Sequence, residues 1–386
     1  MNPTDLYNWE PVLRVMGIGL IVAMGPICWI WLRHRQSDTP SRVQALAILT
    51  LFLTFDLVLF GAFTRLTDSG LGCPDWPGCY GSTSPLGAVS HIDAAQTAMP
   101  TGPVTHGKAW VEMIHRYLAT GVGVLILTLA VFSWTRYFQR HEDARPGWPT
   151  FTLLWVCLQG AFGALTVTMK LFPAIVTLHL LGGMGLLALL CKQTVGANLQ
   201  QRVVLSARLR GALWGVTVLV VCQITLGGWV STNYAVLACN GFPACNAQWW
   251  PVWDGAGFEV WRALGHTASG QLLPFSALVS IHVVHRFMAI VVALALLTLV
   301  WRLHQARVLQ NQATWLLGLV LLQLLTGLSN VVFNWPLLAA VMHTGGAAGL
   351  VLVLTWALAS SQQQPSDSFH ARVTPVRGAT DSRPFA

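Results

Sequence analysis

This chain repeats a pattern: GAFTRLTDSGLGCPDWPGC (residues 61–79) is matched by GGWVSTNYAVLACNGFPAC (227–245). In each stretch a glycine is followed by a cysteine twelve residues later and by a second cysteine six residues after that. Further matches are His115-Arg116-Tyr117 with His285-Arg286-Phe287, and 159–179 with 323–343, which both run from glutamine to histidine. The three offsets, 166, 170 and 164 residues, are nearly constant, which predicts an internal duplication.

The composition is that of a membrane protein. Of the 386 residues, 54% are hydrophobic and only 9% are charged, too few charges to cover a soluble domain of this size. The net charge of +8 does not indicate nucleic-acid binding, because the basic residues are spread over short loops and form no aromatic-interleaved patch. A bilayer core is about 30 Å thick and needs roughly 20 apolar residues per helix, and the apolar stretches of this chain reach that length.

The sequence predicts an all-α polytopic membrane protein with two pseudo-symmetric four-helix transmembrane bundles and one extra N-terminal helix. The nine predicted spans are 11–32, 44–64, 110–134, 150–169, 174–191, 211–231, 279–301, 313–333 and 337–359. The predicted parts are the extra helix with its cytoplasmic loop (1–43), the two halves (44–200 and 201–359) and a disordered cytoplasmic tail (360–386). The first span is interpreted as a retained helix, because its basic cluster follows the apolar run and no signal-peptide cleavage site is evident.

Basic residues predict the orientation. A periplasmic N-terminus puts 15 of the 22 Lys and Arg residues on the cytoplasmic side, as the positive-inside rule favours. Two long loops, 65–109 and 232–278, then face outward, and the second carries Trp249, Trp250, Trp253 and Trp261, which are typical of a membrane interface.

Four histidines occupy repeat-equivalent places, two in each half: His115, His179, His285 and His343. Each lies five to seven residues inside the outer end of a span that runs from outside to inside, so all four share one depth, roughly 7 to 11 Å at about 1.5 Å per residue. Two imidazoles at matched depth predict bis-histidine haem ligation in each half. The alternatives are polar contacts between helices and zinc, for which no cysteine or carboxylate completes a tetrahedron.

The two halves differ beside these histidines. Glu112 lies three residues before His115 on the same helical face, whereas His282 has that position before His285. One carboxylate beside one metal site predicts unequal duties, although an ion pair with Arg116 is also open. Arg65, Arg116 and Arg286 are candidate partners of haem propionates, with snorkelling to the interface as the alternative.

The outer loops also contain two cysteine pairs, Cys73 with Cys79 and Cys239 with Cys245. Disulfides persist in an outward-facing compartment, so a disulfide is predicted within each pair. Whether it acts as a structural clamp or in redox chemistry stays open.

The segments that carry a family resemblance are 61–81, 112–125, 159–179, the second cysteine loop and IHVVHRF (281–287). The chain resembles the haem A synthase family (COX15/CtaA) over roughly residues 44–359. The resemblance implies an oxidoreductase that oxidises a methyl substituent of haem O to a formyl group by two successive hydroxylations, giving haem A. It implies haem B between His285 and His343, the substrate haem between His115 and His179, and Glu112 as the essential glutamate. This chain departs from the family pattern, because nine spans are predicted here and eight are usual in the family.

The resemblance also implies a haem O synthase upstream, a terminal oxidase as recipient, an electron acceptor of unknown identity, and the bacterial inner membrane as location. Two other functions use the same residues. A di-haem b-type electron-transfer cytochrome would use the four histidines without needing Glu112 in one half only. A haem carrier or a disulfide-relay protein is the third class.

Overall fold

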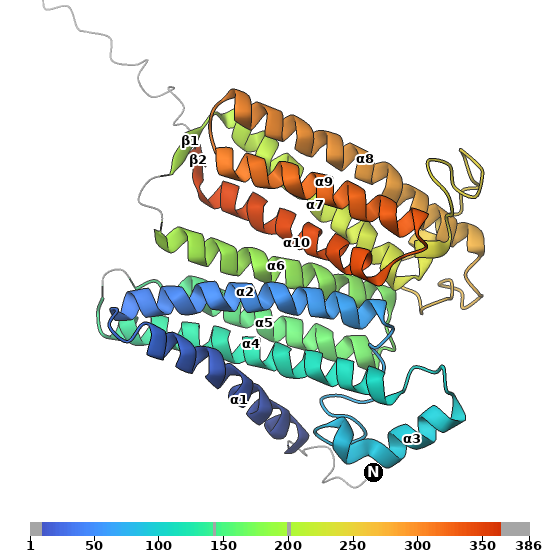
Figure 1. Ribbon diagram of the computed structural model, residues 1–386, viewed down its shortest axis with the longest axis horizontal. Coiled ribbons are helices and arrows are strands. Elements are labelled where there is room, and N and C mark those ends of the chain that lie inside the picture. The colour runs from blue at the N-terminus through green and yellow to red at the C-terminus, as the bar shows by residue number, and fades with distance from the viewer. Residues whose placement is uncertain (1–9, 142–143, 199–201, 364–386) are drawn as a thin grey trace, which may run out of the picture.

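The computed structural model describes residues 10–141, 144–198 and 202–363. Within these ranges, nine helices are long and apolar enough to cross a membrane, as predicted (Figure 1). They are α1 (Glu10–Arg33), α2 (Thr39–Leu66), α4 (His106–Phe138), α5 (Gly147–Thr168), α6 (Pro173–Asn198), α7 (Ala207–Thr232), α8 (Phe275–Gln305), α9 (Gln310–Val332) and α10 (Leu337–Ala359).

Several helices are longer than their predicted apolar windows because polar capping residues begin them. Asp38 accepts a hydrogen bond from the backbone N–H of Ser41 (3.2 Å) at the start of α2. Thr105 does the same for Lys108 (3.3 Å) at the start of α4. Such caps satisfy the free N–H groups of a first turn outside the apolar core. Hydropathy alone therefore underestimates the helix lengths.

The all-α prediction misses one small parallel sheet. β1 (Val203–Leu205) pairs with β2 (Ser361–Gln363), which directly follows α10. Arg210 donates to the carbonyl of Ser361 (2.6 Å), and Ser361 is buried. The prediction of a disordered tail from residue 360 is therefore wrong for its first four residues, because polar Ser and Gln side chains gave no sign of the backbone pairing. The rest of that prediction, residues 364–386, lies outside the described residues.

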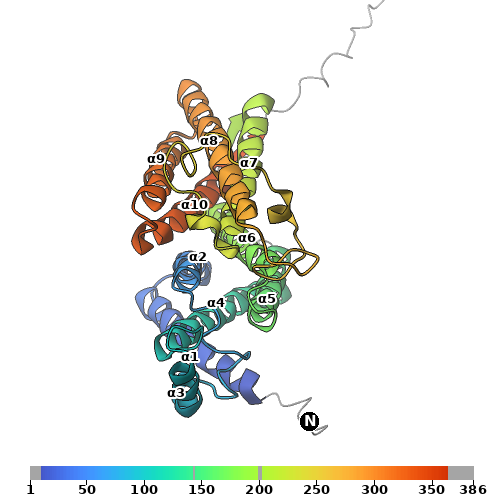
Figure 2. The ribbon, with the colours of Figure 1, turned by 90° about the vertical axis from the view of Figure 1, so that its right-hand side faces the viewer.

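The helices pack in two groups, with α6 and α10 between them. In the first group, α4 and α6 each contact both α2 and α5. In the second group, α8 and α10 each contact both α7 and α9. Contacts of α10 with α6 and α2, and of α6 with α7, join the groups, as Figures 1 and 2 show. The extra helix α1 packs against α4 and α2 at the edge of the first group.

Both long loops lie at one end of the molecule (Figure 1). The first contains η2 (Pro85–Ala88) and α3 (Val89–Ala98), and the second contains η3 (Ala235–Leu237) and η4 (Gly255–Phe258). The four tryptophans expected at a membrane interface are exposed in the second loop, with Trp250 exposed to 93%. The β1–β2 sheet lies at the opposite end. This arrangement separates a loop-covered end from an end with short connections.

Candidate functional site

Each predicted ligand histidine lies against a glycine of the preceding long helix. The four contacts join Gly61 to His115, Gly163 to His179, Gly227 to His285 and Gly327 to His343. A Cβ added at any of these glycines would come within 3.1 to 3.3 Å of the imidazole ring. Glycine therefore makes room for each ring between closely packed helices. In the sequence, Gly61 and Gly227 are recognisable only as positions of the repeat, and no role was predicted for Gly163 or Gly327.

The histidines are paired within each half. His115 interacts electrostatically with His179, and His285 interacts electrostatically with His343. Two imidazoles facing one site between packed helices are a donor set that suits haem iron. Both halves therefore contain a donor set that would suit a haem, and the residues that would hold it are His115 and His179 in one half and His285 and His343 in the other.

A glutamine on the neighbouring helix holds the backbone beside one histidine of each pair. Gln159 on α5 donates to the carbonyl of His179 (2.8 Å), and Gln323 on α9 donates to the carbonyl of His343 (2.7 Å). Both bonds span twenty residues, so the repeat preserves them. In the sequence these glutamines mark only the start of the repeated segments 159–179 and 323–343. The repeated Gln-x-x-x-Gly pattern at 159–163 and 323–327 was the signal that could have predicted these bonds.

The imidazole rings of the second half have polar partners. Thr326 Oγ1 lies 2.9 Å from His343 Nδ1, and Gln223 Nε2 lies 3.1 Å from His285 Nδ1. In the first half, His179 Nδ1 is buried without a hydrogen-bond partner among the described residues. The ring of His115 stacks on Phe60, with ring centroids 6.3 Å apart. The two sites therefore match in their ligand positions and differ in what surrounds the ligands.

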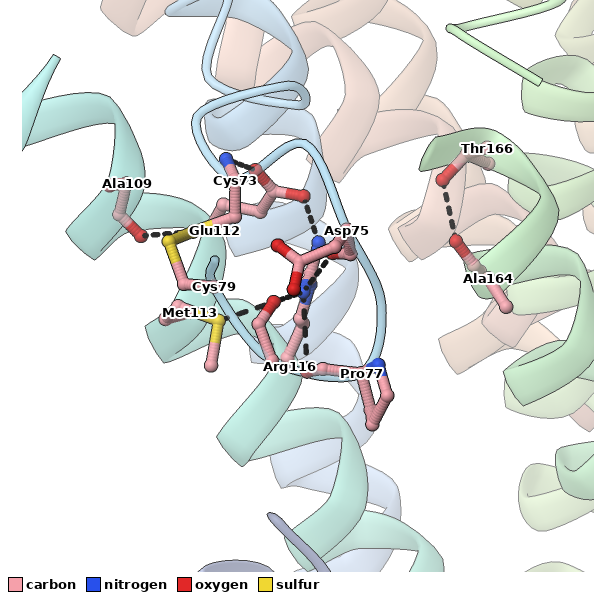
Figure 3. Close-up of polar contacts among 12 residues, drawn as sticks. Cys73, Asp75, Pro77, Cys79, Ala109, Glu112, Met113, Arg116, Ala164 and Thr166 are labelled. Atoms are coloured by element: carbon pink, nitrogen blue, oxygen red, sulfur yellow. Dashed lines mark hydrogen bonds and ion pairs between the residues drawn. A yellow bond between two sulfur atoms is a disulfide. The ribbon is translucent and has the colours of Figure 1, made fainter. Parts of the chain in front are cut away.

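Glu112 is buried and both of its carboxylate oxygens are engaged (Figure 3). Arg116 Nη2 lies 2.5 Å from Oε1, and the backbone N–H of Cys73 donates to Oε2 (2.7 Å). The ion pair that the sequence left open is therefore present, and the Cys73 N–H bond fixes the carboxylate to the first cysteine loop. In the second half His282 has the corresponding position and its Nδ1 lies 3.0 Å from the carbonyl oxygen of Ala235.

Both predicted disulfides are confirmed: Cys73–Cys79 and Cys239–Cys245, each with 4.9 Å between the Cα atoms.

An arginine holds each disulfide loop. In the first, Arg116 Nη1 donates to the carbonyls of Asp75 (2.9 Å) and Gly78 (2.5 Å), as Figure 3 shows for Asp75. In the second, Arg286 donates to the carbonyls of Cys239 (2.6 Å) and Gly241 (2.9 Å). Arg116 and Arg286, two of the candidate propionate partners, therefore donate hydrogen bonds to the disulfide loops of their own halves.

Arg65 links the two halves. Its guanidinium donates to the carbonyl of Ser231 (2.5 Å) and lies over the ring of Tyr234, 4.1 Å from the ring centroid. Tyr234 in turn donates to Asp68 (2.5 Å). Burial raises the pKa of the Tyr234 phenol, and the Arg65 charge opposes that rise. This cluster lies outside the histidine pairs, at the loop end of α2 and α7.

This chain is similar to known proteins over most of its length. The sequence model of the COX15-CtaA family, described as "Cytochrome oxidase assembly protein", matches residues 44–355. The chain belongs to the COX15-CtaA family.

Several similar relatives carry the name "Heme A synthase". The protein of Shewanella oneidensis is 40% identical, and the alignment covers 79% of this chain and 92% of that relative. The protein of Sphingopyxis alaskensis is 30% identical over 79% of this chain and 88% of its own length. That of Caulobacter vibrioides is 28% identical over 83% and 96%, respectively. The COX15-CtaA match includes all four histidines, Glu112 and both cysteine pairs, whereas α1 lies before its first residue.

Proposed function

We propose that this chain is a haem A synthase whose two halves have different duties. It is an oxidoreductase that converts haem O to haem A for cytochrome oxidase biogenesis, as its family and its 40% identity to the Shewanella oneidensis enzyme indicate. The observation that carries the proposal is the pair of histidines set against glycines in each half of a chain with these relatives. The iron porphyrin supplies the oxidative chemistry, and the protein positions and tunes it.

The first half holds the substrate haem O between His115 and His179, and the second holds haem B between His285 and His343. Two differences support this assignment. A carboxylate, Glu112, stands beside the first site only. In the second site Thr326 Oγ1 lies against Nδ1 of His343, as expected of a resident cofactor whose ligand is held in place.

The halves are pseudo-symmetric four-helix bundles. Every contact between long helices in the first half has its counterpart in the second: α2 with α4 and α7 with α8, for example. Two contacts between the halves join residues at equivalent positions of the repeat. Arg65 bonds to Ser231 and Asp68 to Tyr234, and each pair is 166 residues apart, the offset between the cysteine loops. Equivalent residues that touch one another are expected at a two-fold axis.

Glu112 acts beside the reacting methyl group as a proton acceptor or as an orienting group. Its ion pair with Arg116 and its bond from the Cys73 N–H fix where the carboxylate points. Proton transfer by a positioned carboxylate is a recognised way to accelerate such steps. His115 and His179 then need only hold the porphyrin so that its methyl substituent lies within reach of that carboxylate.

The loop end faces the periplasm, with the C-terminus in the cytoplasm and the chain in the inner membrane. The excess of Lys and Arg at the opposite end supports this orientation. A haem O synthase supplies the substrate, a terminal oxidase in assembly receives the product, and an electron acceptor removes the reducing equivalents. Membrane lipid surrounds the nine helices.

Extraction of the haems from purified protein and their separation by chromatography test the proposal. Haem O or haem A beside haem B is expected if the chain is a synthase. Haem B alone, with no haem A formed from added haem O under turnover conditions, would contradict it and would favour the di-haem electron-transfer cytochrome.

A further inference from the structure

The hydroxyl group of Thr326 determines which nitrogen of His343 carries the proton. Thr326 is buried on α9, and its hydroxyl donates to the carbonyl of Leu322 (2.7 Å) with a longer contact to the carbonyl of Gln323 (3.4 Å). A hydroxyl has a single proton to donate. With that proton directed to its own helix, Thr326 Oγ1 can only accept from His343 Nδ1, which lies 2.9 Å away.

A proton on Nδ1 leaves the lone pair of Nε2 free for a metal. A neutral imidazole has one N–H and one acceptor nitrogen, and the hydrogen bond at one nitrogen sets the role of the other. Ligand histidines usually donate their second N–H to such a partner, which orients the ring and makes the ligand more basic. Thr326 therefore prepares His343 for iron before any haem arrives.

In the first half, no threonine hydroxyl stands at the position equivalent to Thr326. The repeat offset of 164 residues, which relates His179 to His343, places Phe162 opposite Thr326. Phenylalanine offers no acceptor, and His179 Nδ1 is buried without a partner among the described residues. The flanking residues are nevertheless conserved between the halves, since Gln159 and Gly163 correspond to Gln323 and Gly327. The difference is confined to one side chain.

We propose that Thr326 is the positioning residue that makes the second site a permanent haem site, and that Phe162 keeps the first site exchangeable. This inference rests on the proposed function, because a synthase must retain its cofactor and release its product. Loss of a partner of this kind typically weakens metal binding by roughly ten- to a hundred-fold. A single hydroxyl is thus enough to separate a resident haem from one that must leave.

The experiment compares Thr326→Val, which keeps the side-chain shape but removes the acceptor, with Thr326→Ser, which keeps the acceptor. The measurements, on the full-length holoprotein, are the reduction potential of the low-spin haem and the rate of its transfer to apomyoglobin. Thr326→Val should raise the potential, because a less basic ligand favours ferrous iron, and should speed haem loss by about ten-fold or more. Thr326→Ser should behave as the parent protein.

Thr314→Val is the matched control, because Thr314 lies exposed on the same helix and its hydroxyl only contacts Gln310 (3.0 Å). It should change neither measurement. An unchanged potential and unchanged haem loss in Thr326→Val would overturn the inference while leaving the proposed function intact. Absence of any haem bound by His285 and His343 in the parent protein would instead contradict the proposed function.

A reciprocal pair tests the first half. Phe162→Thr and Phe162→Val remove nearly the same volume and differ in the hydroxyl. We expect the threonine variant to retain the haem ligated by His179 several-fold longer than the valine variant. Equal retention would overturn the assignment of Phe162.

Discussion

At the scale of single residues, each of the four histidines depends on a glycine that leaves space for its ring. Imidazoles between packed helices need a neighbouring position without a side chain, and four glycines provide it. Not every glycine in these helices does so. Gly160 on α5 and Gly215 on α7 would meet nothing within 4 Å if they carried a Cβ. These glycines are natural controls for the ones that face a ring.

Gly227→Ala should weaken haem binding in the second half, and Gly163→Ala should weaken it in the first. The added Cβ would lie 3.1 Å from His285 or 3.3 Å from His179, so a ring must shift. Overpacking of this kind costs about 1–3 kcal/mol, or roughly 5- to 150-fold in affinity. Haem titration of each purified variant measures the effect. Gly215→Ala and Gly160→Ala should bind haem normally, and equal behaviour of a variant and its control would refute the role of the glycine.

Glu112→Gln should abolish most haem A formation while leaving haem B in place. The amide keeps the shape of the side chain but cannot accept a proton, and general acid–base groups contribute typically 10²- to 10⁴-fold. A fall of at least about 100-fold in the rate of haem A formation is expected, followed by chromatography of extracted haems. An unchanged haem B spectrum serves as the internal control, and full haem A output would remove the proposed role.

At the scale of elements, the helix ends and the disulfide loops form one unit in each half. Arg116 on α4 and Arg286 on α8 each follow a predicted ligand histidine by one residue, and they donate to the carbonyls of the neighbouring cysteine loop. Glu112 joins the first loop from one turn earlier. Hydrogen bonds therefore tie each disulfide loop to the helix segment that carries a predicted ligand histidine.

Arg286→Ala should loosen the second disulfide loop. The change removes charge-assisted bonds to Cys239 and Gly241, which typically contribute about 1.5–3 kcal/mol each. Reduction of the Cys239–Cys245 disulfide by a water-soluble thiol, followed by mass spectrometry of alkylated cysteines, should become several-fold faster. Arg302→Ala, at the opposite end of α8, is the control. A reduction rate equal to the control would show that the arginine does not hold the loop.

The sequence predicted the helices better than the contacts between loops and helices. Apolar windows fixed all nine spans, and the repeat isolated four histidines from twelve. The bonds from Arg116 and Arg286 go to backbone carbonyls, which every residue has, so no sequence pattern marks them. The role of Thr326 likewise depends on which way α9 and α10 face each other.

At the scale of the whole molecule, α1 stands apart from the other long helices of the described residues, because its contacts among them are mainly with α4 and α2. The COX15-CtaA match begins at residue 44, after α1, and α1 packs against the edge of the first half. Gly19 of α1 lies against Thr120, and Val22 of α1 lies against Gly121. At about 100° per residue, Thr120 and Gly121 lie about 140° and 240° around α4 from His115. The extra helix therefore covers the face of α4 opposite the proposed substrate site.

A chain that begins at Gln36 should thus insert, bind both haems and form haem A at a rate within about two-fold of the full chain. It keeps Asp38, the cap of α2, and it keeps Arg42, which favours a cytoplasmic start for that helix. The exposed faces of Thr120 and Gly121 lose packing, so the Tm followed by the haem absorbance should fall. Selective loss of the haem bound by His115 and His179 would contradict this placement, because it would make α1 part of the substrate site. Loss of both haems together would mean that α1 is needed for the fold of the first half, against the position of the family match.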